Sequence, residues 1–236
     1  MQLLLFNAFN GLIQGVFYAL MALGLALILS LNSVINMAHG GFLVIGAYLA
    51  YTLYPFLGFW GAQGLPFQVP EALNSPISSV LFFITGYRVL VVGITFAVMF
   101  GLYALLRYSR LGIRIRAGTL DLETVSALGV NIYLLRALNF GLGCMLAGLA
   151  GVLAAGILGL TPPMGSSLIM PSFVAIIVGG VGSLVGSILG GLLIGVAAGI
   201  TTTYYPAASE AVIYLIMLIV LVIRPRGLLG QEGLFE

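Results

Sequence analysis

Long apolar stretches separated by short polar segments run through most of this chain of 236 residues. They cover about 11–31, 42–56, 89–106, 134–160, 168–181, 183–201 and 211–223. A helix needs about 20 apolar residues to cross a hydrocarbon core of about 30 Å, and it satisfies its own backbone hydrogen bonds in lipid. Membrane β-strands would instead alternate apolar and polar residues, which these stretches do not. The pattern predicts an all-α, polytopic membrane protein with about seven spans.

One or two of these helices are expected to be broken. The segment NMAHGG at 36–41 interrupts the first two apolar stretches. Gly40 and Gly41 weaken a helix there, and irregular backbone at membrane depth is tolerated only beside protein or a water-filled cavity. The span at 168–181 is short and contains Pro171, so it is predicted to be broken or re-entrant.

Asn36 and His39 are the polar side chains of the first interruption, and His39 is the one histidine in the sequence. Two interpretations remain open: hydrogen bonds between helices, or a broken helix that lines a translocation path. The candidates for such a path are Asn36, His39 and Gly40, together with Gln14 and Tyr18 of the first span. His39 is not expected to act as a base or a metal ligand, because nothing in the chain can partner it chemically.

Composition narrows the function classes. Hydrophobic residues make up 61% of the sequence and charged residues 6%, whereas a soluble domain carries about 25% charged residues. The chain has no lysine, so it lacks the P-loop lysine of an ATPase. With one histidine, one cysteine and six carboxylates, neither a catalytic triad nor a metal cluster is expected. The net charge of +2 is too small to indicate a nucleic acid partner. An enzyme is therefore not expected.

The arginines predict the orientation in the membrane. They cluster in one loop, at Arg107, Arg110, Arg114 and Arg116, and recur after the last span, at Arg224 and Arg226. Basic loops lie preferentially in the cytoplasm. Four spans fit between the two clusters, which places the loop at 58–79 and the turn at 201–210 outside.

Residues 119–129, TLDLETVSALG, are predicted to form a short helix outside the membrane. Thr119 or Asp121 can cap its first N–H groups, and Glu123 suits the positive end of the helix dipole. Gly129 suits the left-handed residue that follows a helix. An apolar stripe is expected from Leu122, Val125 and Leu128.

The residues alone leave two roles open for this helix. Its apolar stripe and the neighbouring Arg114 and Arg116 are typical of an element that docks on a cytoplasmic partner. They are equally typical of a helix that rests at the lipid interface, with its arginines on anionic headgroups.

Small residues recur every four positions between 182 and 199. One row holds Gly182, Gly186 and Gly190, and the next holds Ser183, Ser187, Gly191, Gly195 and Gly199. Small residues four apart share a helix face and let a neighbouring helix approach closely. Tight helix packing is the simpler interpretation, and a surface that slides during transport is the alternative.

Several stretches, in order along nearly the whole chain, resemble the branched-chain amino acid ABC transporter permeases. The cytoplasmic segment is similar to that family's coupling loop at 110–112 (RLG), 116–117 (RA), Asp121 and 126–131 (SALGVN). The other matching stretches are 18–20 (YAL) with 22–24 (ALG), 36–40 (NMAHG), 146–152 (LAGLAGV), 173–175 (FVA), 179–183 (GGVGS), 190–191 (GG) and 224–230 (RPRGLLG).

The resemblance implies a single permease domain over 1–236, with its coupling loop at 107–131, in the bacterial cytoplasmic membrane. The implied partners are a second homologous permease subunit, two cytoplasmic ATPase subunits and an extracytoplasmic substrate-binding protein, with ATP and Mg²⁺ held by the ATPases. Transport would proceed by alternating access. The implied coupling residues are Arg114, Arg116, Asp121, Glu123, Leu128 and Gly129. The implied cargo is a branched-chain or other hydrophobic amino acid, with urea, short amides and small carboxylates as alternatives.

One departure from the family pattern lies near residues 54–60. Family members carry about two more spans between the stretch that matches 42–56 and the loop that begins at 58. Here YPFLGFW leads almost directly from one to the other. The sequence therefore predicts a missing segment at this place.

A passive channel or a secondary transporter is the competing class. Proton-coupled transporters carry ionisable groups inside their spans, whereas the carboxylates of this chain fall in its predicted loops and tail. A channel would fit the glycine-rich helices, but it would have no use for the cytoplasmic helix at 119–129.

Overall fold

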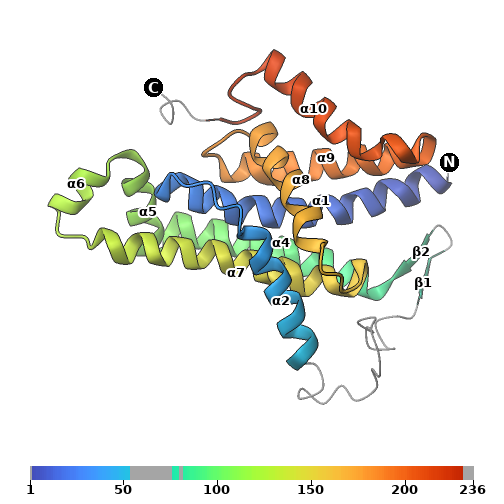
Figure 1. The fold of residues 1–236 in the computed structure, drawn as a ribbon, viewed down its shortest axis with the longest axis horizontal. Helices are drawn as coiled ribbons and strands as arrows, with labels where there is room; N and C mark the ends of the chain where they lie inside the picture. The colour runs from blue at the N-terminus through green and yellow to red at the C-terminus, as the bar shows by residue number, and fades with distance from the viewer. Residues whose placement is uncertain (1, 54–75, 80–81, 231–236) are drawn as a thin grey trace.

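The computed structural model describes residues 2–53, 76–79 and 82–230. Its helices are α1 (Gln2–Asn32), α2 (His39–Leu53), α4 (Gly86–Tyr108), α5 (Arg110–Leu120), α6 (Leu122–Ala127), α7 (Ile132–Leu158), α8 (Met164–Gly179), α9 (Leu184–Tyr204) and α10 (Ser209–Ile223), with a 3-10 turn, η1 (Pro206–Ala208). Two antiparallel strands, β1 (Pro76–Ser79) and β2 (Phe82–Thr85), precede α4. Figure 1 shows the long helices side by side, with α2 and α8 crossing them at steep angles.

The prediction of a polytopic helical membrane protein is confirmed. In the described part of the chain, five helical segments are long and apolar enough to cross a membrane: α1, α4, α7, α9 and the segment Pro206–Ile223 that contains α10. The shorter apolar helices are α2, with 15 residues, and α8, with 16. The loop predicted at 58–79 is corrected at its end, because Pro76–Ser79 form β1.

Helix α8 also corrects the prediction of a break at 168–181. It runs without interruption through Pro171. The chain instead breaks before the helix, at residues 159–163, where Gly159 has a φ of +75°. Pro171 is the eighth residue of α8, so the helix continues past it without the hydrogen bond that an N–H group there would donate to the Ser167 carbonyl.

Helix α1 is the centre of the bundle and is buried along most of its length. Helix α9 lies along it, and the two backbones meet at glycines. A Cβ atom placed on Gly11 would lie 2.5 Å from the carbonyl oxygen of Gly195 and 2.8 Å from Cα of Gly199. A Cβ on Gly191 would lie 2.6 Å from the backbone nitrogen of Ala19. Contacts this close require glycine on at least one helix.

The two rows of small residues pack on different neighbours. Gly191, Gly195 and Gly199 face α1, whereas Gly186 and Gly190 contact Gly179 and Ala175 of α8. Gly182 corrects the prediction, because it lies in the turn between α8 and α9 with a φ of +86° and not on a packing row. The expectation of tight packing is confirmed for the other glycines of the set.

Helices α7 and α8 repeat the order of α1 and α2, a long helix followed by a short one. In Figure 1, α7 runs opposite to α1, and each long helix is followed by a short connection and a steeply inclined short helix. The short helices begin in mutual contact, since a Cβ on Gly40 would lie 2.7 Å from the carbonyl oxygen of Gly165. Helix α9 lies along α1, whereas a larger part of α7 is left uncovered by the described residues. Accordingly, α7 is much less buried than α1.

The ends of the bundle differ in charge. Figure 1 places α5, α6 and the end of α10 at one end, and the start of α1 with the β1–β2 hairpin at the other. Arg224 follows α10 directly. Both arginine clusters therefore lie at the same end of the bundle, as the orientation predicted from the sequence requires.

The α1–α9 contact generates a stability prediction. Gly195→Ala should lower the free energy of unfolding by about 1–3 kcal/mol, because the added methyl group meets the backbone of Gly15. Gly101→Ala is the matched control, since a Cβ there has nothing within 4 Å. Thermal unfolding in detergent measures both variants, and equal melting temperatures would contradict the close contact.

Candidate functional site

The NMAHGG segment forms a turn that starts α2. Residues 33–38 lie outside any helix, and Ser33 has a φ of +51°. The Asn36 side-chain oxygen accepts a hydrogen bond from the Ala38 N–H, 3.1 Å away, and the Asn36 carbonyl accepts one from the His39 N–H. The side chain and the carbonyl of Asn36 therefore accept hydrogen bonds from backbone N–H groups of the turn, as an N-cap residue does.

The His39 side chain is completely buried. It lies against the α1–α7 crossing, where a Cβ on Gly24 would be 2.9 Å from His39 Nε2 and 2.7 Å from the carbonyl oxygen of Gly143. The Met21 carbonyl approaches the ring, but neither ring nitrogen has a partner in hydrogen-bonding geometry among the described residues. Buried polar atoms without partners are rare.

Asn139 is a second buried polar residue in the same region, and the sequence analysis missed it. Its Nδ2 donates a hydrogen bond to the Leu27 carbonyl, 2.5 Å away, and so joins α7 to α1. Its Oδ1 is buried without a partner in the described part of the chain. A lone amide inside an apolar span is the signal that could have identified it. His39 and Asn139 together give the α1–α7 region unsatisfied polar atoms.

A cavity of about 270 Å³ opens at the end of the bundle that is opposite to α6. We call it the outer cavity. The residues lining it come from α1, α4, α7 and α9: Asn7, Asn10, Gly11, Ile13, Gln14, Phe17, Arg88, Ile157, Leu158, Gly199 and Thr202. Arg88 Nη1 donates a hydrogen bond to Asn10 Oδ1, and Asn7 Nδ2 donates one to Thr203 Oγ1 over 3.1 Å. Amide and guanidinium groups thus face apolar side chains.

A larger cavity, of about 600 Å³, lies at the other end and is called the inner cavity here. Helices α1, α4 and α9 contribute to both cavities, and α5 closes the inner one. Its lining is mostly apolar, with one arginine, Arg116. The Arg116 Nη2 donates a hydrogen bond to the Arg107 carbonyl, 3.3 Å away.

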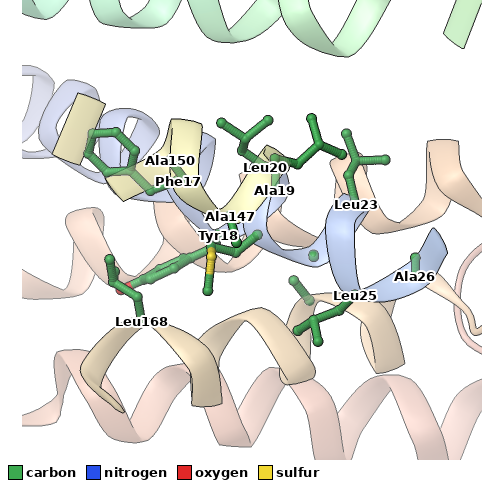
Figure 2. Close-up of a cluster of buried hydrophobic side chains, with 14 of the residues drawn as sticks. Phe17, Tyr18, Ala19, Leu20, Leu23, Leu25, Ala26, Ala147, Ala150 and Leu168 are labelled. Atoms are coloured by element: carbon green, nitrogen blue, oxygen red, sulfur yellow. The ribbon is translucent and has the colours of Figure 1, made fainter. Parts of the chain in front are cut away.

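The residues expected to line a path fall in three places. Gln14 lines the outer cavity. Tyr18 is buried in the apolar core, and in Figure 2 its ring extends toward Leu168 of α8. Asn36, His39 and Gly40 line neither cavity and lie where the short helices α2 and α8 begin. The structure does not bring the five residues into one site.

The segment that follows α4 corrects the prediction of one helix over 119–129. Two helices, α5 and α6, meet at Asp121, whose extended backbone has a φ of −154° and a ψ of 103°. Thr119 does not cap α6, since its hydroxyl donates to the Arg116 carbonyl. Asp121 is the cap, because its side chain accepts hydrogen bonds from the N–H groups of Glu123 and Thr124, 3.0 and 3.1 Å away.

These bonds keep the Asp121 carboxylate ionised. The Thr124 hydroxyl, the Thr124 N–H and the Glu123 N–H hold the pKa of Asp121 below its usual value. Because this carboxyl pKa is lower in the folded state, the ionised carboxylate stabilises the folded protein at pH values above the unfolded-state pKa. That stabilisation is lost as the pH falls through the folded-state pKa. The cap is therefore fully formed at neutral pH.

The three residues of the apolar stripe expected in this segment differ in burial. Val125 is buried and Leu122 half-buried, whereas Leu128 is 77% exposed. Leu120, at the end of α5, is 89% exposed. Gly129 has a φ of +82°, which confirms the left-handed residue predicted after the helix. Arg114, Arg116 and Glu123 are exposed. The segment therefore presents apolar and charged side chains at the arginine-rich end of the bundle.

Within the described residues, no three His, Cys, Asp or Glu side chains lie close enough to hold a metal ion. The described residues form a bundle of apolar helices with two shorter apolar helices, a cavity at each end and a short capped helix at the arginine-rich end. This arrangement defines a polytopic membrane transport protein. The chain belongs to the family of permease components of branched-chain amino acid transport systems, whose family model matches residues 7–73 and 59–221.

Individual relatives agree with this family. The high-affinity branched-chain amino acid transport system permease proteins LivH of Salmonella typhimurium and of Escherichia coli are 28% identical over 290 residues, covering 94% of each chain. BraD of Pseudomonas aeruginosa is 28% identical over 289 residues, with the same coverage. The probable LivH of Methanocaldococcus jannaschii is 24% identical over 278 residues, covering 90% of this chain and 88% of that protein. No solved structure matches.

The relatives are longer in the interior than this chain. The match to LivH extends over 290 positions, but 94% of 236 residues is about 222, so about 68 positions of the match have no residue here. The two segments matched by the family model overlap at residues 59–73. A missing segment near 54–60, as the sequence predicts, would produce both facts. Those residues lie outside the described part of the chain.

The unsatisfied imidazole generates a prediction. His39→Leu should raise the free energy of unfolding by about 1–3 kcal/mol, because it removes two buried ring nitrogens that have no partner in hydrogen-bonding geometry among the described residues. Thr95→Val is the control, since the buried Thr95 hydroxyl already donates to the Val91 carbonyl and its loss should give no gain. Thermal unfolding in detergent compares them. A lower melting temperature for His39→Leu would mean that the imidazole has a partner in the folded protein.

Proposed function

We propose that this protein is the permease subunit of an ATP-binding-cassette importer, in which partner ATPases drive a small solute across the bacterial cytoplasmic membrane by alternating access. The observation that carries the proposal is the geometry of α6. It is a rigid, capped element at the arginine-rich end, with Leu128 exposed beside it. A channel has no use for such an element, whereas an importer needs one to receive motion from its ATPases.

Helices α5 and α6 are well placed to pass such motion into the membrane. Gly118 contacts Leu31 at the end of α1 and Leu135 at the start of α7, since a Cβ there would lie 2.9 Å from Leu31 Cδ1 and 3.5 Å from Leu135 Cδ2. Leu122 packs on the same core. A displacement of α6 would therefore reach the two helices that cross at Gly24 and Gly143.

The two cavities and the unsatisfied polar atoms support a second arrangement of the bundle. The inner cavity is the larger one here, and the α1–α7 region holds the unpartnered atoms of His39 and Asn139. A rearrangement that opens the outer end and hydrates those atoms would remove their desolvation penalty. Each nucleotide state of the ATPases must favour one arrangement by its contact free energy.

The partners follow from what this chain leaves incomplete. ATP and Mg²⁺ bind on two cytoplasmic ATPase subunits, because the chain has no P-loop lysine. A substrate-binding protein delivers cargo at the outer end. A second permease subunit covers the non-helical segment 33–38, where Val34, Ile35 and Met37 are exposed, since irregular backbone at membrane depth does not face lipid. The proposed cargo is a branched-chain or other hydrophobic amino acid.

Substitution of the α6 cap tests the coupling role. Asp121→Ala should lower the ATPase activity that the binding protein stimulates, and uptake with it, because the first N–H groups of α6 lose their acceptor at a cost of about 1 kcal/mol. Asp121→Asn is the matched control, because asparagine caps as well as aspartate and should keep both activities. Both are measured in proteoliposomes with the assembled transporter.

Binding of the substrate-binding protein to the outer face should not change in either variant, since α6 lies at the opposite end. Unchanged ATPase stimulation in Asp121→Ala would remove α6 from the coupling mechanism. A wild-type complex without stimulated ATPase activity would overturn the importer assignment itself.

A further inference from the structure

The outer cavity is lined by an arginine that no carboxylate of the described residues pairs with. Arg88 lies in the first turn of α4 and is half-buried. Its Nη1 donates to Asn10 Oδ1, and its other N–H groups have no acceptor among the described residues. None of the described residues that line the cavity is acidic. This part of the chain therefore gives the cavity a positive charge without a paired carboxylate, which suits an anionic group.

The other residues that line the outer cavity indicate which further chemical groups the ligand has. Amide and hydroxyl groups come from Asn7, Asn10, Gln14 and Thr202. An apolar wall comes from Phe17 of α1 together with Ile157 and Leu158 of α7. The volume of about 270 Å³ falls just below the range of pockets that hold drug-sized molecules, about 300–1,000 Å³. The ligand is thus a small molecule with an anionic end, a hydrogen-bonding group and an apolar part.

We infer that the outer cavity receives the cargo as it enters the permease, and that Arg88 binds its carboxylate. Guanidinium and carboxylate groups form paired, charge-assisted hydrogen bonds. The amide oxygens of Asn7 and Gln14 accept from the cargo ammonium group, and Phe17 and Leu158 contact its aliphatic side chain. The inference rests on the proposed import of an amino acid and deepens it, because a neutral cargo such as urea would have no need of Arg88.

The position of the cavity fits this role. The same three helices, α1, α4 and α9, contribute to the outer and inner cavities, so cargo at Arg88 stands at one end of a common boundary. Between the cavities α4 buries Val91, Met99 and Leu102. Cargo therefore stops at Arg88 until the helices rearrange.

A lipid phosphate is the other anion that an arginine near a membrane surface binds. The experiment must therefore separate cargo from lipid. Purified transporter with its ATPases and binding protein is reconstituted in liposomes of neutral lipid alone and in liposomes that include anionic lipid. Leucine uptake and ATPase activity are measured together at saturating binding protein.

Arg88→Gln should lower the maximal rate of leucine uptake by at least about tenfold, the size of a lost charge-assisted hydrogen bond. ATPase activity stimulated by the binding protein should stay within about twofold of the wild type, because α6 and its cap lie at the other end. Arg88→Lys should restore part of the uptake. Arg136→Gln is the matched control, because Arg136 is exposed and lines neither cavity, and it should transport normally.

Two results would overturn the inference. The first is uptake by Arg88→Gln at the wild-type rate. The second is a loss of uptake that occurs only in liposomes with anionic lipid, which would assign Arg88 to a lipid phosphate. Failure of the importer proposal is distinguishable, because it would abolish stimulated ATPase activity in the wild type as well.

Direct occupancy can be measured without turnover. In the assembled transporter with Cys144→Ser, Thr202→Cys places a thiol in the outer cavity, at a side chain that is exposed and that has no assigned contact with the cargo. Millimolar leucine should slow its labelling by a water-soluble maleimide, whereas leucinamide, which lacks the carboxylate, should not. Equal protection by both compounds, or by neither, would contradict the role of Arg88. The assay also covers the case in which Arg88→Gln fails to fold.

Discussion

The structure depends on backbone contact between helices at glycine. Lipid gives apolar helices no hydrophobic reason to associate, so packing must come from close approach. Helix α1 meets α9 at Gly11 and Gly195, and it meets α7 at Gly24 and Gly143. Helix α9 uses a separate pair of glycines against α8. The cavities, the buried histidine and helices α5 and α6 are all positioned by this one set of contacts around α1.

The apolar pattern was sufficient to predict the long helices, because a span in lipid must be apolar over its whole length. It could not predict where a helix begins within the polar ends. Helix α1 begins at Gln2, before Asn7 and Asn10, because Asn7 bonds Thr203 of α9 and Asn10 accepts from Arg88 of α4. The apolar pattern also could not predict the break between α5 and α6 at Asp121. Its side chain satisfies the first N–H groups of α6, and so it separates two helices in a segment with continuous helical propensity.

The candidate site was predicted in part. The sequence marked the NMAHGG interruption, and α2 does begin there. Its side chains, however, are used locally: Asn36 completes a turn, and His39 fills the space beside Gly24. The outer cavity was indicated by Gln14 alone, because its other walls come from four helices that are distant in sequence. Arg88 looks like an ordinary residue at the end of a span until the structure places Asn10 beside it.

The meeting of Gly40 and Gly165 constrains how the bundle can move. Each residue leaves room for the carbonyl of the other, so the first turns of α2 and α8 share one small volume. Neither short helix can tilt or advance without displacing its counterpart. A displacement of one short helix would therefore act directly on the other at this contact. In an importer of the proposed kind, the two halves of this subunit would then rearrange together and not as two independent gates.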